Sequence, residues 1–425
     1  MGKRENRTAV ARCLQWTNGH RRAAGTMWHA RGVPDTSQLL EGVIRHAREL
    51  EGDFRPVVAE LAASGDTSLV PRIHEALRAF MTDGNWYGRD LMADILVGLI
   101  GADAFPTVLG VWAVDLGDDR DSLSATVLDL IDADRTVCLT TIRQFAEDAD
   151  PDRRQAGIWA MGQAIGSDGL DDADFEIVAR ACRDPDGDLR ATALGALSPG
   201  RNGDRALALL MAALHDPEPD VRISAVSELG YSQRTDLVPA IAAMATDPDP
   251  HVRASVASAL GRLGDEAGVP AALMLVDDGH PRVRSCAVKT LGELGGDRAT
   301  ALLVERAGSP DPEVRRQAGE ALAANVTPET LTHVRRLCND AEAVVRASAV
   351  AALGWSKAAA GGPIVAERAK DPDPTVRLHV AVAIDRVAWP DADAVLRRLA
   401  KDRDQEVRRV AARTLELRAG RPRDE

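Results

Sequence analysis

A motif of 15 residues recurs along most of this chain at a nearly constant spacing. One copy, over residues 247–261, reads DPDPHVRASVASALG. The first step between successive motif arginines is 32 residues and every later step is 31, as their positions give: Arg190, Arg222, Arg253, Arg284, Arg315, Arg346, Arg377 and Arg408. An internal repeat with a period of about 20–50 residues is typical of stacked copies of one supersecondary unit. The repeat therefore predicts one elongated body rather than several globular domains.

Each unit begins with a segment that favours a short helix. Over residues 237–244, apolar residues recur at three- and four-residue spacing, and Pro239 stands where the opening turn would lie. A missing N–H costs least in that turn. Asp247-Pro248 ends the segment, because the residue before a proline is pushed out of the helical region.

A second helix is predicted directly after this turn. Asp249 is placed as its N-cap and Pro250 at its first position. Three residues at i, i+4 and i+8 form its apolar stripe: Val252, Val256 and Leu260. Gly261 follows the stripe and is expected to end the helix.

Charged residues accompany the repeat at fixed positions. An aspartate precedes the motif arginine by six residues in most units, as Asp247 precedes Arg253, and Ser309 interrupts this pattern before Arg315. A guanidinium group can bind several carboxylate or carbonyl oxygens at once. We therefore interpret the arginines as a structural ladder within and between repeats, made of Arg222, Arg253, Arg284, Arg315, Arg346, Arg377 and Arg408.

The consensus D-P-D-P-x-V-R-x-x-A-x-x-A-L-G, preceded by a shorter helix, resembles the phycobilisome-lyase (EZ-type) family of HEAT-like repeats. The resemblance is strong from about Asp184 to Leu417 and looser over residues 38–165. It implies an all-α fold, a right-handed α-solenoid of stacked helical hairpins with a period of about 31. Such repeats serve as bilin lyases, adaptors, regulators and, in distant relatives, DNA glycosylases, so the resemblance does not fix an activity.

Four segments are predicted along the chain. Residues 1–36 form a basic N-terminal tail, 37–165 are degenerate HEAT-like repeats, 166–417 are regular repeats continuous with them, and 418–425 are a C-terminal tail. The last helix is rich in arginine, which is typical of the polar helix that covers the end of a solenoid.

Charge and composition exclude several classes of function. The net charge of −13 and the pI near 5.3 disfavour nucleic acid and anionic membrane surfaces as partners. Five scattered cysteines without a C-x-x-C pair indicate neither a disulfide framework nor a zinc site, and no uninterrupted run of 18 apolar residues occurs. We expect a cytoplasmic protein with no catalytic, cofactor-binding or metal-binding residues, because none of the common catalytic motifs is present.

Partner-binding residues are predicted on the second helices, which line the concave face of a HEAT-like solenoid. At the positions expected to face the groove stand Ser224, Ser227, Ser255, Ser258, Lys289, Gln317, Glu320, Ser348 and His379. Trp159 is added as a candidate aromatic anchor, since aromatic residues are common anchors of interfaces. Aspartates also recur along the turns, and a partner bound at that edge would be basic.

These features favour a non-catalytic scaffold that binds a protein or peptide through the concave groove or the acidic turn edge. The alternative is a lyase-like or chaperone-like component that acts on a tetrapyrrole or a modified peptide. A DNA-lesion glycosylase ranks last, because the predicted groove residues are small and mostly neutral rather than cationic.

Overall fold

The computed structural model describes residues 35–49, 54–118, 120–165, 169–197, 199–387 and 389–419. Of the basic tail predicted over residues 1–36, only the last two residues fall within this range, and helix α2 already begins at Thr36. The described residues form helices joined by short turns and contain no strand. The predicted all-α solenoid of helical hairpins is confirmed.

Contacts between helices divide the chain into two compact units, one that ends at Leu209 and one that begins at Leu210. The sequence divides the chain elsewhere, after residue 165, by the regularity of its repeats, and that boundary stays a prediction. Helix α12 (Pro199–Ala213) contains the junction of the two units and is kinked at Gly203, whose φ is 62°.

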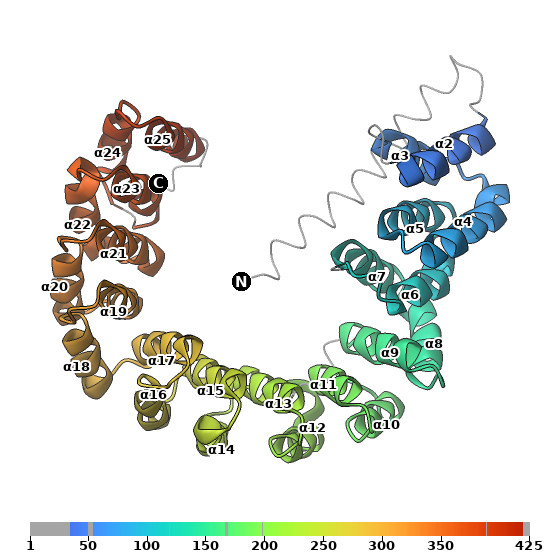
Figure 1. The fold of residues 1–425 in the computed structure, drawn as a ribbon, viewed down its shortest axis with the longest axis horizontal. Coiled ribbons are helices and arrows are strands. Elements are labelled where there is room, and N and C mark those ends of the chain that lie inside the picture. The colour runs from blue at the N-terminus through green and yellow to red at the C-terminus, as the bar shows by residue number, and fades with distance from the viewer. Residues whose placement is uncertain are drawn as a thin grey trace. The chain divides into compact units, whose positions relative to one another are not determined.

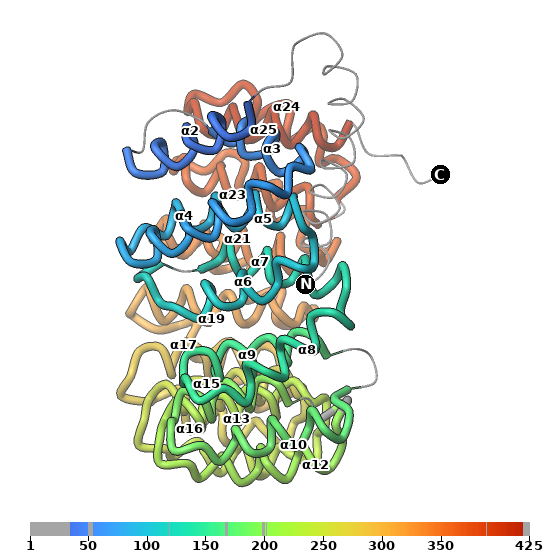
Figure 2. The backbone as a smooth tube through the Cα atoms, turned by 90° about the vertical axis from the view of Figure 1, so that its right-hand side faces the viewer, coloured from blue at the N-terminus to red at the C-terminus, as the bar shows by residue number. Residues whose placement is uncertain are grey.

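The first unit consists of five hairpins stacked in chain order (Figures 1 and 2). The second helices of successive hairpins contact one another. In order, the helices are α2 (Thr36–Glu49), α3 (Arg55–Ala63), α4 (Val70–Thr82), α5 (Trp86–Ile100), α6 (Phe105–Ala113), α7 (Asp121–Ala133), α8 (Arg135–Ala146), α9 (Pro151–Gln163), α10 (Asp172–Ala181) and α11 (Gly187–Gly195). Short 3-10 turns η1 (Thr67–Leu69) and η2 (Gly101–Ala104) precede α4 and α6.

The second unit repeats the same arrangement with greater regularity. Its odd-numbered helices form one layer, in which each helix packs on the next, and its even-numbered helices form the other (Figure 1). They are α13 (Pro219–Tyr231), α14 (Val238–Ala243), α15 (Pro250–Leu263), α16 (Val269–Leu275), α17 (Pro281–Leu294), α18 (Asp297–Arg306), α19 (Pro312–Ala324), α20 (Pro328–Leu337), α21 (Ala343–Ser356), α22 (Gly362–Glu367), α23 (Pro374–Arg386), α24 (Ala392–Leu399) and α25 (Gln405–Ala419).

Local sequence explains how each second helix starts and which face it buries. The Asp249 carboxylate accepts hydrogen bonds from the backbone N–H groups of His251 (2.7 Å) and Val252 (3.3 Å), as predicted for an N-cap. The apolar stripe predicted for α15, which consists of Val252, Val256 and Leu260, is fully buried. The predicted hairpin unit is therefore confirmed in detail.

The predicted end of this helix at Gly261 is wrong. Helix α15 continues to Leu263 and is capped by Gly264, whose φ of 68° is left-handed. Glycines at equivalent positions serve helix packing instead. A Cβ atom on Gly292 would lie 2.4 Å from the carbonyl oxygen of Ala321 on the next second helix, so only glycine permits this close approach.

Two aromatic placements and the C-terminal boundary also differ from prediction. Trp86 and Trp355 are helical rather than in turns, since α5 begins at Trp86 after its cap Asn85 and α21 continues to Ser356. Helix α25 extends to Ala419, beyond the predicted start of a tail at residue 418. Arg418 is held in that helix by ion pairs with two carboxylates of the preceding hairpin.

One described segment, Trp86–Ala113, is long and apolar enough by composition to cross a membrane. In the structure it is not one helix, because η2 separates α5 from α6 and the φ of Gly101 is 60°. Arg89 of this segment is fully buried and paired with Asp118. We therefore interpret these helices as part of the core of a repeat.

Candidate functional site

The motif arginines each bind the turn of their own repeat through one nitrogen. Nη1 of Arg222 donates to the carbonyl oxygens of Asp216 (2.9 Å) and Pro217 (3.1 Å). Equivalent pairs of hydrogen bonds to the residues six and five positions earlier are made by Arg154, Arg190, Arg253, Arg284, Arg315, Arg346, Arg377 and Arg408. The six-residue interval in the sequence therefore reflects a contact to a backbone carbonyl and not to the aspartate side chain.

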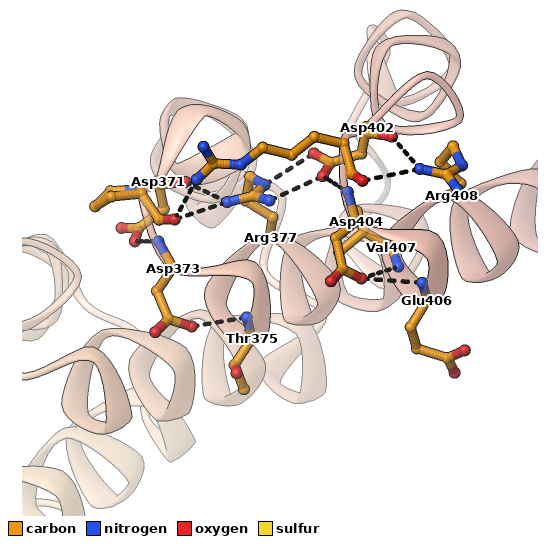
Figure 3. A network of polar contacts seen from close by, with 11 residues as sticks. Asp371, Asp373, Thr375, Arg377, Asp402, Asp404, Glu406, Val407 and Arg408 are labelled. Carbon is orange, nitrogen blue, oxygen red and sulfur yellow. Dashed lines mark hydrogen bonds and ion pairs between the residues drawn. The ribbon is translucent and has the colours of Figure 1, made fainter.

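The other two guanidinium nitrogens of the ladder arginines bind a carboxylate in the next repeat. Nε and Nη2 of Arg377 each donate to the Asp402 carboxylate at 2.8 Å (Figure 3). Four further rungs have the same 25-residue separation, with distances of 2.7–3.0 Å: Arg222–Asp247, Arg253–Asp278, Arg315–Asp340 and Arg346–Asp371. The predicted structural ladder is present in these five rungs of the second unit.

Each rung carboxylate also organises its own turn. The Asp402 Oδ1 atom accepts from the backbone N–H of Asp404 at 2.9 Å, and the Asp404 carboxylate in turn caps α25 (Figure 3). Hydrogen bonds from Arg377 hold the pKa of Asp402 below its usual value. The rung and cap carboxylates at this edge are thus already engaged within the protein.

Two ladder arginines have no rung carboxylate. The residue 25 positions after Arg284 is Ser309, and Arg408 belongs to the last repeat. In the part of the chain that the structure describes, both keep only the carbonyl contacts of their own turns. The break that the sequence places at Ser309 is therefore a missing rung.

A groove of about 620 Å³ lies across the second helices α17, α19 and α21. Its lining includes four residues predicted as partner contacts, namely Lys289, Gln317, Glu320 and Ser348. Ala321, Ala324, Ala351 and Ala352 are among its other lining residues, so its surface is built largely from small side chains. A surface of this kind lets the backbone of another chain approach closely.

The charges of the groove are paired side by side. Lys289 lies 3.6 Å from Glu293 on the same helix. Glu320 accepts hydrogen bonds from Arg316 and from the Ser348 hydroxyl of the next repeat. These exposed side chains can exchange their partners for groups on a bound chain, because surface ion pairs contribute little stability.

Trp355 forms an aromatic wall of the groove that the sequence analysis did not include. Its side chain lies near the end of α21 and is 66% exposed. The guanidinium carbon of Arg386 lies 3.5 Å from the ring centroid. Assigning this residue to a loop concealed its position, although the 31-residue register places it one position after the motif glycine.

The remaining predicted contacts lie outside this groove. Ser224 and Ser227 lie on α13, Ser255 and Ser258 on α15, and His379 on α23, all partly exposed. Trp159 belongs to the first unit and is partly covered, because it stacks on Trp112 with ring centroids 4.2 Å apart. Trp159 is thus a packing contact between α6 and α9.

The groove offers binding groups rather than a catalytic constellation. Its described lining contains no histidine or cysteine that could form a nucleophile–base pair with a serine. Elsewhere in the described part of the chain, no three potential ligands gather around a metal position, and the rings of His251 and His280 lie 5.8 Å apart without a third ligand.

Two other hollows of similar size carry less information about a partner. One, of about 610 Å³, lies beside the rung of Arg377 and Asp402, and one of about 580 Å³ lies between α4 and α6. Neither is lined by any of the predicted partner contacts. We therefore take the groove of α17, α19 and α21 as the candidate site.

Comparison with known proteins identifies the repeat. A family model described as HEAT repeats matches residues 139–229, 207–284, 273–354 and 362–424. No curated protein sequence matches the chain. These matches include the regular units and reach into α8 and α9.

Solved structures show the same fold at low sequence identity. Importin beta is 13% identical, with a TM-score of 0.51, over 96% of this chain and 66% of its own. The complex of CpcE and CpcF of phycocyanin lyase from Nostoc is 19% identical, with a TM-score of 0.36, over 60% of this chain and 97% of its own. Human deoxyhypusine hydroxylase is 21% identical, with a TM-score of 0.27, over 59% and 97%.

Proposed function

Because this chain belongs to the HEAT-repeat family, we propose that it is a non-catalytic interaction scaffold that binds a protein or peptide in the groove of α17, α19 and α21. One observation carries the proposal. Four partner contacts predicted from sequence line this groove together with the exposed Trp355. Stacked repeats build extended surfaces of this kind, on which other chains bind.

The lining of the groove suits a polypeptide ligand. Its alanine and serine residues allow a backbone to lie close to the helices, and Trp355 supplies an apolar anchor beside them. Lys289 and Glu320 lie on neighbouring helices and can fix the direction of a bound chain through hydrogen bonds. The rung carboxylates are already used by arginines, so we place the partner in the groove rather than on the acidic turn edge.

The test compares partner capture by the full chain and two variants from an extract of the native cells. We expect Trp355→Ala to lose a protein that the unmodified chain retains, because the anchor is removed. Tyr231→Ala is the matched control: Tyr231 is 65% exposed at the equivalent position of α13, four repeats earlier, but does not line the groove. Equal capture by both variants would contradict the proposed site.

A photoreactive residue at position 351 gives a second readout, since Ala351 lines the groove. Crosslinks from position 351, and none from the exposed Glu305 on the outer helix α18, would support binding in the groove. An absorbance scan of the same preparations tests the alternative, because a tetrapyrrole ligand would be coloured. A cytoplasmic location is part of the proposal, and fractionation of native cells tests it.

A further inference from the structure

The turn Ala307–Pro310 differs from the equivalent turns of the second unit in one respect. Five of those turns contain the aspartate that accepts two hydrogen bonds from the arginine of the preceding repeat. Ser309 takes the place of that aspartate. This substitution shortens the side chain and removes a negative charge from a site that is otherwise built in the same way.

The arginine that should bind this turn is anchored as in the complete rungs. Nη1 of Arg284 donates to the carbonyl oxygens of Asp278 (2.8 Å) and Gly279 (3.0 Å). In the five complete rungs the same anchor accompanies two hydrogen bonds from Nε and Nη2 to the carboxylate 25 residues later. Among the described residues no carboxylate pairs with Arg284, and its register directs those two nitrogens to the turn at Ser309.

Two more arginines donate to the same turn. Nη2 of Arg336 lies 3.1 Å from the carbonyl oxygen of Ala307, and Nη1 of Arg315 lies 3.0 Å from that of Ser309. The next turn has the same three arginine contacts, from Arg368, Arg346 and the fork of Arg315, and it contains Asp340 at its centre. The turn Ala307–Pro310 therefore has the cationic surroundings of a rung and lacks its anion.

Ser309 keeps the second task of the missing aspartate. Its hydroxyl oxygen accepts a hydrogen bond from the backbone N–H of Asp311 at 3.2 Å, as each rung carboxylate does two residues onward. The serine is partly exposed, and the flanking Gly308 and Pro310 are exposed. The hydroxyl is thus fixed within the turn at the solvent edge of the unit.

We propose that this turn holds a phosphate group that completes the ladder at Arg284. A guanidinium fork binds phosphate oxygens as it binds a carboxylate, through two parallel hydrogen bonds. The group is either a phosphate ester of Ser309 or free inorganic phosphate. In the first case a kinase transfers the γ-phosphoryl group of a nucleoside triphosphate: the Ser309 hydroxyl loses its proton and forms the O–P bond as the bridging P–O bond to the diphosphate breaks.

The first experiment asks whether the turn accepts an anion through Arg284. Thermal unfolding of the full chain is compared for Ser309→Asp and the neutral, similarly sized Ser309→Asn. We expect the aspartate to raise the midpoint by about 2–4 °C over the asparagine, and this gain to disappear in an Arg284→Gln background. Equal midpoints, or a gain that persists without Arg284, would overturn the proposal.

The second experiment separates the two sources of phosphate. For free phosphate, titration of the unphosphorylated chain with inorganic phosphate should show binding that is weakened about tenfold or more by Arg284→Gln, as for a lost charge-assisted contact. For the ester, mass spectrometry of the chain isolated from its native cells should find phosphoserine at position 309. Detection of either supports the site and names its source, and absence of both contradicts it.

Discussion

At the scale of single residues, the ladder depends on the shape of the guanidinium group. Arg377 binds two carbonyl oxygens of its own turn through Nη1 and the Asp402 carboxylate through Nε and Nη2. A lysine ammonium is a point charge with three donors and cannot span these oxygens in one plane. The planar fork therefore joins two successive turns, which explains why arginine recurs at this position.

We predict that Arg377→Lys lowers the free energy of unfolding by about 2 kcal/mol, the scale of hydrogen bonds to charged groups. Arg377 is buried, so the lost contacts are not replaced by water. Arg408→Lys is the matched control, because Arg408 makes the same carbonyl contacts without a rung carboxylate in the described chain. Chemical denaturation measures both, and an equal loss for the two variants would mean that the carboxylate contributes nothing.

The rung carboxylates predict a loss of stability in acid. Arginine hydrogen bonds lower the folded-state pKa of Asp278, Asp340 and Asp402. In acid the unfolded chain then binds more protons at these groups, so stability is present above the unfolded pKa of about 3.9 and is lost as pH falls through the folded pKa. Asp402→Asn should flatten this part of the curve of unfolding free energy against pH. A curve as steep as that of the unmodified chain would contradict the assignment.

At the scale of the helix, glycine sets how closely second helices approach. A Cβ atom at Gly292 would meet the backbone of α19, whereas none of the atoms considered lies within 4 Å of a Cβ at Gly195 in α11. We predict that Gly292→Ala costs about 1–3 kcal/mol of stability through overpacking. Gly195→Ala should be neutral or gain up to about 1 kcal/mol from helix propensity. Thermal unfolding of the two variants distinguishes these effects, and a stabilised Gly292→Ala would show that the helices can separate without cost.

The apolar stripe of each second helix carries most of the packing between layers. Leu260 is fully buried, and Leu417 on the terminal helix is largely exposed. Leu260→Ala should destabilise the chain by about 2–5 kcal/mol, as large-to-small changes in cores do. Leu417→Ala should change stability by less than about 0.5 kcal/mol. A loss below that value for Leu260 would mean that the stripe does not form the core.

Local periodicity was enough to predict the hairpins, the caps and the buried stripes, because these depend on residues close in sequence. The rungs could be predicted only as a class. The interval of six residues between Asp247 and Arg253 suggested a local charge pair, whereas the carboxylate partner of Arg253 is Asp278 in the next repeat. Contacts between repeats depend on how the units stack, and spacing within one unit does not encode that.

The candidate site follows the same division. Lys289, Gln317, Glu320 and Ser348 were predicted from their register on the second helices, which the 31-residue period sets. Trp355 was missed because the helix was expected to end before it, and Gly354 in fact lies inside α21 to permit close packing on Ala383. The motif glycine gives a helix-ending signal in the sequence that tertiary packing overrides.

At the scale of the second unit, the rungs form a chain in which each turn serves two arginines. Asp371 accepts the fork of Arg346 with its carboxylate and Nη1 of Arg377 with its carbonyl oxygen. Arg222 shares no printed hydrogen-bond partner with Arg377 and stands five repeats earlier. Stability in such a stack is approximately a sum of terms for each repeat and for each pair of neighbours.

Double variants test this description of the ladder. Arg222→Lys combined with Arg377→Lys should add in unfolding free energy to within about 0.5 kcal/mol, because the two rungs share no partner. Arg346→Lys combined with Arg377→Lys should deviate from the sum by about 0.5–3 kcal/mol, because both arginines hold Asp371 in one turn. Chemical denaturation of the four single and double variants with the unmodified chain closes each cycle. Additivity for the neighbouring pair would mean that the rungs act independently and that the ladder does not couple one repeat to the next.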